Sequence, residues 1–382
     1  MHILVCSTIL PFINKYILAV QRWLLFPAFS VTAENGIFAA PYYLTVKKPL
    51  TLFVYFCIIF ISMFRRLYNP EVFQGNLRKK HYFEGWYFKQ VTEDLCHTFS
   101  FIPGVSLIEN DPHAFIQIMN GSTGNTDYLR YPLDEFRWDK RKLFLKVGSS
   151  TFTESGIIID IKSESINLTG QIDFNNIIKY PKSILSPGIM GWYSFVPFME
   201  CNHGIVSVNH DLHGEISINK DVIDFRGGKG YIEKDWGVSF PEAWIWVQSN
   251  NFEEHDTSFS FSIAKIPWLG SFFIGFIAFL YLNKKFYLFS TYNKSHFWEI
   301  SHNKEIIEIT VGNNKNILKI RVIINSFGDL KAPVSGEMSR RIKESIDSEV
   351  HLQLLDKYKN LEYEGTGKSV GLEIIEKIFD YI

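Results

Sequence analysis

Two short segments of the chain place carboxylates directly beside aromatic side chains. In the first, Tyr82–Lys89 (YFEGWYFK), Glu84 follows Phe83 and precedes Trp86 by two positions. On a strand, Glu84, Trp86 and Phe88 share one face, because successive side chains point to opposite sides. If that face points inward, burial raises the pKa of the carboxyl and keeps it protonated near neutrality. Glu84 is therefore a candidate proton donor; the alternative is a structural ion pair with a neighbouring Lys or Arg.

The second segment, Gly227–Gly237 (GGKGYIEKDWG), carries two carboxylates, Glu233 and Asp235. On an extended strand these side chains are two positions apart and project the same way. Like charges side by side raise the pKa of one group and leave the other ionised, which gives an acid and a base on one element. The alternative is a solvated turn with Lys234 between the two carboxylates.

Metal, nucleotide and serine-hydrolase chemistry find no support in the motifs. His203, His210 and His213 have spacings that match no standard metal site, and His210 and His213 would face opposite ways on one strand. Turn and sheet-surface roles are therefore expected for them, and no metal is predicted. The chain has no GxGxxG or P-loop opening a helix and no GxSxG.

Composition narrows the class of protein further. The 382 residues suffice for two domains with sizeable cores, and an aromatic content of 16% favours strands and apolar cavities. A net charge of −1 gives no basic face for nucleic acid. The four cysteines are far apart and form no CxxC, which is typical of a reducing compartment. We therefore expect a cytoplasmic or membrane-associated protein that is not secreted.

Residues 1–65 differ from the rest and form a hydrophobic N-terminal extension. They include an uncharged run, Leu50–Phe64, of 15 residues with basic pairs on both sides. This run is shorter than the roughly 20 residues that span a bilayer, and no secretory signal pattern is present. Three interpretations remain: a short membrane anchor, a buried extension, or translated upstream sequence with the start at Met63. The last is favoured, because the strand pattern begins soon after Met63.

A long-period repeat indicates two related β lobes. Placing Trp86 on Trp246, an offset of 160 residues, also places Thr98–Phe101 (TFSF) on Ser258–Phe261 (SFSF). Self-similarity at a fixed long period is the signature of a duplicated unit. The turn-rich stretch Tyr180–Gly188 separates the lobes, which gives a first lobe over residues 66–180 and a second over 181–382.

Strand patterns with turns every 8–12 positions fill both lobes. The uncharged run Trp268–Leu282 has the length and glycines of a buried strand pair rather than a membrane helix. A helix is conceivable over Met338–Ile346, and Gly371–Ile382 is either helix or a closing strand. These patterns predict an all-β fold. Many short strands and a surplus of aromatics favour two tandem lipocalin-like antiparallel β-barrel lobes that hold an apolar ligand.

Several motifs in one order resemble the tocopherol cyclase family over about residues 66–382. They are the Asn69–Gly75 segment followed by Tyr82–Lys89, then Met190–Cys201 (MGWYSFVPFMEC), Glu233–Pro241 (EKDWGVSFP) and Trp244–Asn250 (WIWVQSN). The resemblance implies a lipocalin-like architecture, distantly similar to carotenoid 1,2-hydratases. It further implies closure of a phytylated hydroquinone, or another prenylated quinol, onto its own prenyl double bond to give a chromanol.

This chemistry needs a proton for an alkene and then attack by a phenol oxygen on the tertiary cation. A carboxylic acid held neutral in an apolar cavity can donate that proton. We expect Glu84 or Glu233 as the acid and Asp235 as the base. The expected lining residues are Trp86, Phe88, Trp192, Trp236 and Trp246, whose rings can stabilise a cation.

No metal or organic cofactor is required for such a ring closure. The expected partner is an apolar small molecule, a prenylated quinol or isoprenoid, reached from a membrane by peripheral contact. Two alternatives remain open. One is a non-catalytic lipocalin-type carrier of an isoprenoid or lipid, and the other is a hydratase that adds water to an isoprenoid alkene.

Overall fold

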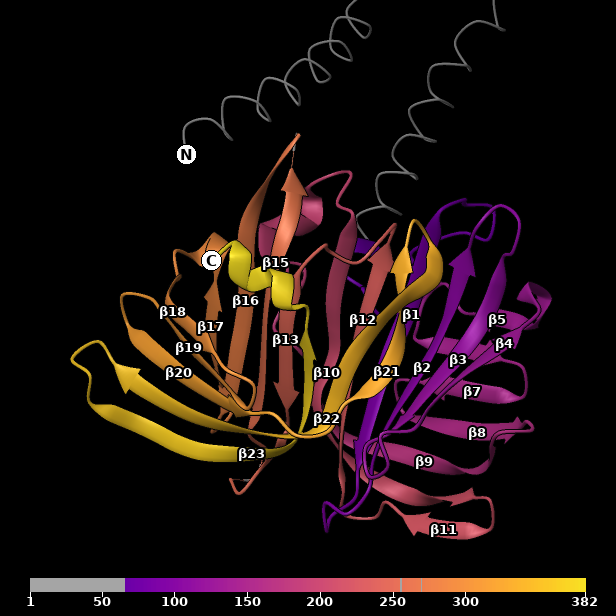
Figure 1. Cartoon of the computed structure of the whole chain (residues 1–382). Helices are drawn as coiled ribbons and strands as arrows, with labels where there is room; N and C mark the ends of the chain where they lie inside the picture. The colour runs from indigo at the N-terminus through magenta and orange to yellow at the C-terminus, as the bar shows by residue number, and fades with distance from the viewer. Residues whose placement is uncertain (1–65, 255, 269) are drawn as a thin grey trace, which may run out of the picture. The chain divides into compact units, whose positions relative to one another are not determined.

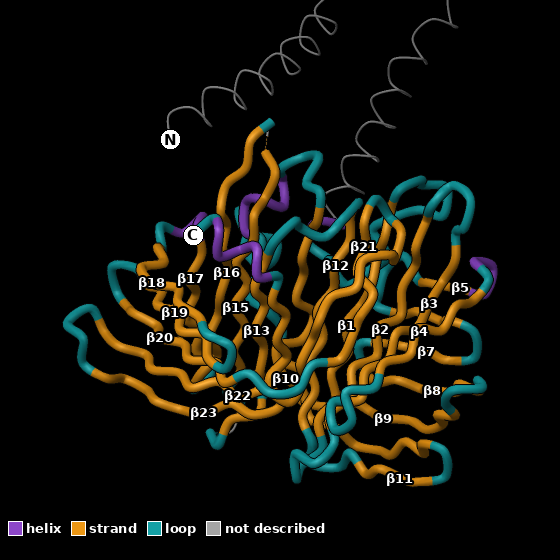
Figure 2. The backbone as a smooth tube through the Cα atoms, viewed as in Figure 1, coloured by secondary structure: helices purple, strands orange, loops and turns teal. Residues whose placement is uncertain are grey.

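The computed structural model describes residues 66–254, 256–268 and 270–382, and they form an all-β structure of two antiparallel sheets. The expectations for the N-terminal extension lie outside the described residues. Within the described ranges, none of the helices has the length and apolar character needed to cross a bilayer. Figure 1 shows the two sheets side by side, and Figure 2 shows that helices in this part of the chain are short, one of them near the C-terminus.

The first sheet has 12 strands in the order β4-β3-β2-β1-β12-β10-β9-β8-β7-β6-β5, with β11 paired to β10. Its strands are β1 (Tyr82–Val91), β2 (Thr98–Leu107), β3 (His113–Asn120), β4 (Thr126–Tyr131), β5 (Phe136–Trp138), β6 (Phe144–Val147), β7 (Ser150–Thr153), β8 (Gly156–Lys162), β9 (Asn167–Ile178), β10 (Cys201–Ile218), β11 (Asp221–Asp224) and β12 (Lys229–Gly237). Two short 3₁₀ helices, η1 (Leu133–Glu135) and η2 (Gly191–Phe195), lie in its connections.

The second sheet has 11 strands in the order β17-β16-β15-β13-β23-β22-β20-β19-β18, with β14 paired to β23 and β21 to β22. Its strands are β13 (Trp244–Ser249), β14 (Asn251–Phe252), β15 (Ser258–Trp268), β16 (Ser271–Leu282), β17 (Lys285–Ser290), β18 (His296–His302), β19 (Ile306–Gly312), β20 (Asn316–Ile323), β21 (Gly328–Val334), β22 (Glu337–Asp356) and β23 (Leu361–Ile374). Two more 3₁₀ helices are η3 (Thr291–Asn293) and η4 (Glu376–Asp380).

The two sheets follow the same course, as the sequence repeat predicts. In each, the first four paired strands run outward from the centre, here β1 to β4 and β13, β15, β16 and β17. The chain then crosses to the far edge and returns strand by strand until its last strand, β12 or β23, pairs with the first. The second sheet therefore repeats the topology of the first.

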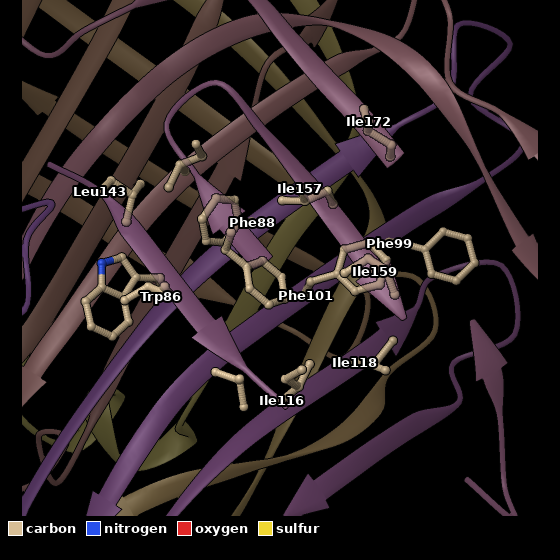
Figure 3. Close-up of a cluster of buried hydrophobic side chains, with 14 of the residues drawn as sticks. Trp86, Phe88, Phe99, Phe101, Ile116, Ile118, Leu143, Ile157, Ile159 and Ile172 are labelled. Carbon is tan, nitrogen blue, oxygen red and sulfur yellow. The ribbon is translucent and has the colours of Figure 1, made fainter. Parts of the chain in front are cut away.

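Each sheet has its own apolar core, and a third cluster lies between the sheets. The first sheet curls until β6 contacts β2 and β3, which makes it a nearly closed barrel. Figure 3 shows its filling, which includes Trp86, Phe88, Phe99 and Phe101. The cluster between the sheets holds side chains from the opposite faces of β1, β12 and β13, among them Tyr87. Alternate residues of β1 thus face the barrel interior and the second sheet.

Several sequence expectations change in detail. The division between the sheets falls at residues 238–243, and β10, β11 and β12, which follow residue 180, belong to the first sheet. The expected helix over Met338–Ile346 is wrong, because these residues lie in strand β22. The run Trp268–Leu282 is strand, as expected. Within Gly371–Ile382, the residues up to Ile374 belong to β23, the closing strand of the second sheet. The 3₁₀ helix η4 follows this strand.

The repeat itself contains a shift of one residue that the sequence alignment hides. The TFSF and SFSF segments open β2 and β15, which pair with β1 and β13. Lys89 pairs with Ser100, whereas Gln248 pairs with Ser260. The position that corresponds to Trp246 is therefore Tyr87, and not Trp86. This shift matters because neighbouring residues on a strand point to opposite faces.

Candidate active site between the two sheets

A cavity of about 150 Å³ lies between the sheets, where β12 of the first faces β13, β15, β16 and β23 of the second. Most of its wall is apolar and aromatic, from Tyr193, Phe240, Trp244, Trp246, Phe273 and Phe276. Its polar wall is a group of titratable side chains, Glu200, Cys201, His203, Glu233, Asp235 and Glu373. A concave apolar site with a few converging polar groups is the usual form of a small-molecule site.

Strand β12 positions two of these carboxylates by simple alternation. Tyr231, Glu233 and Asp235 point away from the barrel, whereas Ile232 and Lys234 are buried on the barrel side. The prediction that Glu233 and Asp235 project the same way is therefore consistent with the cavity wall that they share. They do so in a cavity rather than in a solvated turn, since the exposed fraction of Glu233 is only 5%.

The neighbouring strand β10 adds a histidine between these two acids. His203 is the register partner of Asp235, and its Nδ1 lies 2.9 Å from Asp235 Oδ1. Its Nε2 lies 3.8 Å from Glu233 Oε2. The same Oε2 accepts hydrogen bonds from the Tyr231 hydroxyl (2.7 Å) and from Trp246 Nε1 (3.2 Å). The second oxygen of Glu233 is left to carry a proton.

The electrostatics of this group favour a neutral Glu233 and a charged His203. Burial is the main cause that raises the pKa of Glu233 to about 7; His203, Tyr231 and Trp246 oppose it. Burial alone would lower the pKa of His203, but the carboxylates of Asp235 and Glu233 outweigh it and raise that pKa to about 9. Near neutral pH the group thus combines a charged imidazolium pair with an acid that exchanges its proton in this pH range.

A second buried carboxyl, Glu373 of β23, completes the polar wall. Trp244 Nε1 donates to its Oε2 at 2.6 Å, and burial raises its pKa to about 8. Glu373 pairs with Trp246 in register, as Glu233 pairs with Tyr87. Since Tyr87 and Trp246 occupy corresponding positions, Glu233 and Glu373 do too. The rings of Tyr87 and Trp246 meet edge to face at 5.4 Å, which places the corresponding strands against each other.

A smaller cavity of about 60 Å³ lies on the other side of the same carboxyls. Its wall includes Glu344, which is fully buried and accepts a hydrogen bond from the Tyr87 hydroxyl at 2.7 Å. Burial raises the pKa of Glu344 well above its ordinary value. Lys89, also fully buried, donates to Gln248 Oε1 (2.6 Å) and to the Ser369 carbonyl (2.7 Å).

The walls of the two cavities carry more carboxyls than cations. The carboxyls are Glu200, Glu233, Asp235, Glu344 and Glu373, and the cations on these walls are His203 and Lys331. Burying an unpaired ionised carboxylate costs several kcal/mol, on the order of 3–5. Burial accordingly raises the pKa of Glu233, Glu344 and Glu373, which makes the group a source of protons beside an apolar cavity.

The three groups His203, Glu233 and Asp235 also have ligand atoms within 4.8 Å of one another. These atoms could surround a metal ion. However, Glu233 Oε2 already accepts two hydrogen bonds, and the imidazole of His203 faces Asp235 at hydrogen-bond distance. Charge is thus balanced within the group, and we do not assign these residues as metal ligands.

Glu84 has the structural role that was left open as its alternative. Its carboxylate is fully buried and forms an ion pair with Lys234 Nζ at 2.5 Å. It also accepts from the amides of Gln74 (2.7 Å) and Gly75 (2.9 Å) and from the Tyr82 hydroxyl (2.5 Å). Burial lowers the pKa of Lys234 to about 8, although Glu84 opposes this. Glu84 contributes to neither cavity wall, so the structure offers it no route to a substrate.

The five expected lining residues lie in different places, and only some of them are near the cavities. Trp246 lines both cavities. Trp86 and Phe88 instead fill the barrel, as Figure 3 shows, and Trp236 packs against that core. Lys234 Nζ lies 4.5 Å from the centre of the Trp86 ring and 4.7 Å from that of Trp236. Trp192 of η2 is partly exposed and stacks on Tyr193, which is part of the cavity wall.

Sequence reasoning missed His203, Trp244, Glu344 and Glu373 as members of the site. His203 was expected in a turn or on a sheet surface, and its position opposite Asp235 depends on the pairing of β10 with β12. Glu373 stands in a segment, GLEII, whose strand character was left undecided. A search for charged residues at strand positions that are otherwise apolar would have found Glu344 and Glu373, because such positions are rare.

We expect His203 to make the stability of the protein depend on pH in a defined direction. Its pKa is raised from 6.5 to about 9, so its stabilising contribution is complete below pH 6.5 and lost as the pH rises through 9. The free energy of unfolding of His203→Gln should therefore lie below that of the unaltered protein at pH 6, by on the order of 2–3 kcal/mol, with the gap closing above pH 9. Urea unfolding at several pH values measures this.

The control is His210, which is buried against Phe174 and whose pKa burial lowers to about 3. A lowered pKa reverses the sign: the contribution is present above pH 6.5 and lost as the pH falls. The gap for His210→Gln should therefore narrow toward acid. If both gaps change in the same direction with pH, the assignment of a charged His203 is wrong.

Residues 146–375 match the family model described as tocopherol cyclase-like, which is more than half of the chain. The chain belongs to the tocopherol cyclase-like family. The matched range includes His203, Glu233, Asp235 and Glu373, whereas the Tyr82–Lys89 segment lies before it. The resemblance inferred from the motifs is thereby confirmed.

Two curated proteins of this family share a short part of the chain. A probable chloroplastic tocopherol cyclase of Oryza sativa subsp. japonica is 36% identical over 62 residues, or 16% of this chain and 13% of that protein. The chloroplastic tocopherol cyclase of Zea mays is 34% identical over 62 residues, with the same shares. The matched part thus spans about an eighth of the length of these tocopherol cyclases.

A solved structure, kievitone hydratase from Nectria haematococca, is also similar to this tocopherol cyclase-like chain. The similarity covers 79% of this chain and 93% of that one, with 10% sequence identity and a TM-score of 0.43. We base no assignment on a similarity of this extent.

Proposed function

We propose that this protein is an enzyme that closes a prenylated hydroquinone to a chromanol by protonating the prenyl double bond. The observation that carries the proposal is Glu233, a buried carboxyl on the wall of an aromatic cavity, whose pKa burial raises to about 7. Membership of the tocopherol cyclase-like family supports the same reaction class. We further propose that each sheet is a lipocalin-type unit and that the ligand lies between the units.

In the proposed reaction, Glu233 transfers its proton to the less substituted carbon of the prenyl alkene. The positive charge then develops on the tertiary carbon, and a phenol oxygen of the same molecule attacks it to form the new C–O bond. The phenol proton passes to Asp235, whose carboxylate lines the cavity beside His203. The product is an isomer of the substrate, so no other reactant is consumed. The proton returns from Asp235 to Glu233 through His203, which lies between the two acids.

The aromatic wall can stabilise the cation and keep water away from it. Trp244 and Trp246 lie on the wall with their indole N–H groups directed at Glu373 and Glu233. Their rings can stabilise a cation through their quadrupoles, by up to about 2 kcal/mol for a desolvated contact. Exclusion of water also favours attack by the tethered phenol over hydration, which separates this proposal from a hydratase.

The proposed reaction should lose activity as the pH rises above neutrality. Glu233 must be protonated to act, and its pKa is about 7. We expect kcat/KM to be constant at acidic pH within the stable range and to fall about tenfold per unit well above pH 7, since the protonated fraction of the free enzyme falls in this way. The profile should be measured as kcat/KM, from initial rates at low substrate, because kcat reports the pKa of the enzyme–substrate complex instead. A profile that rises through pH 7 would indicate that Glu233 acts as a base.

The decisive test is turnover of a phytylated benzoquinol by the purified full chain, with the chromanol detected by mass spectrometry. A product of unchanged mass with a closed ring supports the cyclase. A product heavier by one water identifies a hydratase. Binding of the quinol, followed by fluorescence of Trp246 and its neighbours, without any product identifies a carrier and overturns the proposal.

A further inference from the structure

Exposed apolar side chains occur on two segments that also supply residues of the cavity wall. They come from the connection between β9 and β10, which contains η2, and from the end of the β15–β16 hairpin. We call them the apolar rim: Ile184, Leu185, Trp192, Phe195, Phe198, Trp268 and Phe272, all of them at least one-third exposed. In Figures 1 and 2 the β15–β16 hairpin protrudes beyond the other strands, with a short helix beside it. Large apolar patches of this kind mark interaction surfaces.

Direct ring contacts join the apolar rim to the cavity. Trp192 stacks on Tyr193 with ring centres 4.2 Å apart, and Tyr193 stacks on Phe273 at 5.7 Å. Both Tyr193 and Phe273 belong to the cavity wall. An apolar molecule leaving a surface against the rim would therefore meet aromatic side chains of the same cavity wall that contains Glu233.

Phe198 carries two unfavourable features at once. Its side chain is fully exposed, and its backbone has φ +64°, a conformation that bulky residues rarely adopt. Each feature costs free energy in water, and strained residues concentrate at functional positions. Contact with an apolar phase would recover the cost of exposure without any change in the backbone.

The charges near the apolar rim favour a lipid surface as its partner. Residues 183–199 contain no charged side chain, and neither does the run Trp268–Leu282 that first suggested a membrane segment. Lys182, which pairs with Glu71, precedes the first of these runs and Glu200 follows it, and Lys265 Nζ lies 4.5 Å from the centre of the Phe272 ring. Arg66 and Lys79 line a groove with Met199, which also belongs to the cavity wall. Aromatic residues with basic neighbours are typical of proteins that lie on an anionic membrane surface.

We propose that the apolar rim docks on a lipid bilayer and that the isoprenoid substrate passes from the bilayer into the cavity between the sheets. The identity of the passing molecule rests on the proposed function, but docking itself does not. The uncharged hairpin end and the segment around η2 would enter the headgroup region together. A second copy of this chain is the other occupant to be tested.

Sedimentation with vesicles of phosphatidylcholine, with and without phosphatidylglycerol, tests the proposal on the full chain without substrate. The rim variant is Ile184→Ser, Leu185→Ser and Phe198→Asn, in which asparagine suits the left-handed backbone. The control removes three apolar side chains of β8, β11 and β23 that are about half exposed, Ile158→Ser, Val222→Ser and Leu361→Ser. We expect the rim variant to partition onto vesicles about tenfold or more weakly, and the control to behave as the parent.

Hydrogen exchange locates the contact independently of residues 1–65, which all three proteins share. Vesicles should slow amide exchange about fivefold or more in residues 183–199 and at Phe272, and leave the β18–β19 hairpin unchanged. Vesicle binding without this protection, or no binding at all, overturns the proposal. So does a parent that sediments as a dimer without lipid when the rim variant is a monomer.

Turnover separates this proposal from the proposed function. With detergent-solubilised quinol, the rim variant should keep the parental kcat, because the three replaced residues lie outside the cavity wall. With quinol in vesicles its rate should fall in proportion to its weaker binding. An inactive parent that still docks through the rim leaves the docking intact and refutes only the reaction.

Discussion

Glu233→Gln is expected to lower kcat for chromanol formation by about 10²–10⁴-fold, the usual contribution of a positioned general acid. Glutamine keeps the size of the side chain and its acceptor oxygen for Tyr231 and Trp246. What it lacks is the proton that the alkene needs. Binding of the quinol should therefore change only a few-fold, so the loss should appear in kcat and not in KM.

Glu373→Gln is the matched comparison, because Glu373 is the corresponding carboxyl on the second sheet and also retains its proton. If Glu233→Gln keeps turnover within threefold while Glu373→Gln loses it, the acid is Glu373 and the reaction runs from the other wall. If both variants keep turnover, neither carboxyl is the donor. Single-turnover measurements with chromanol detection distinguish these results from slow product release.

Lys234→Met is expected to lower the free energy of unfolding by about 3–5 kcal/mol, because it leaves the Glu84 carboxylate buried without its cation. The Pro70 and Val72 carbonyls also lose the ammonium group that donates to them at 2.7 and 2.6 Å. Urea unfolding at pH 7 measures the change. A loss of this size is a large part of the total free energy of unfolding of a typical single domain.

The double variant Glu84→Gln with Lys234→Met should recover part of this loss, since it removes the unpaired charge. An exposed pair serves as the control. Lys80 and Glu109 form an ion pair in which both side chains are more than half exposed, and Lys80→Met should cost less than 1 kcal/mol, as is usual for such pairs (about 0–1). If Lys234→Met costs no more than this control, Glu84 is not held by the pair.

Local geometry on single strands was predictable from the sequence. The alternation of side chains placed Glu84, Trp86 and Phe88 on one face, and Glu233 and Asp235 on another, and both groupings agree with their surroundings. What alternation does not indicate is what each face meets. The face of Glu84 fills the barrel, whereas the opposite face of the same strand, with Tyr87, meets the second sheet.

Long-range pairing is what the sequence could not supply. Lys234 meets Glu84, 150 positions away in the sequence, because β12 pairs with β1, and Glu373 reaches Glu233 only when the two sheets pack together. The repeat indicated two related halves, but a one-residue shift in strand register reversed the face assigned to the tryptophans. Register is set by pairing across the sheet and by burial, and neither can be read from a single amino-acid sequence.

The correspondence of Glu233 with Glu373 bears on how such a site could originate. Tyr87 touches Trp246 and Lys89 touches Gln248, and in each case the two partners hold the same position in the two halves. A half-length ancestor pairing with a copy of itself would bring one glutamate against its own duplicate across a two-fold axis. Fusion into one gene allows the two glutamates to change separately. One can then remain the proton donor while the other alters the electrostatic potential at that donor. The histidine and the aspartate beside these acids both come from the first sheet, and such divergence would leave this asymmetry.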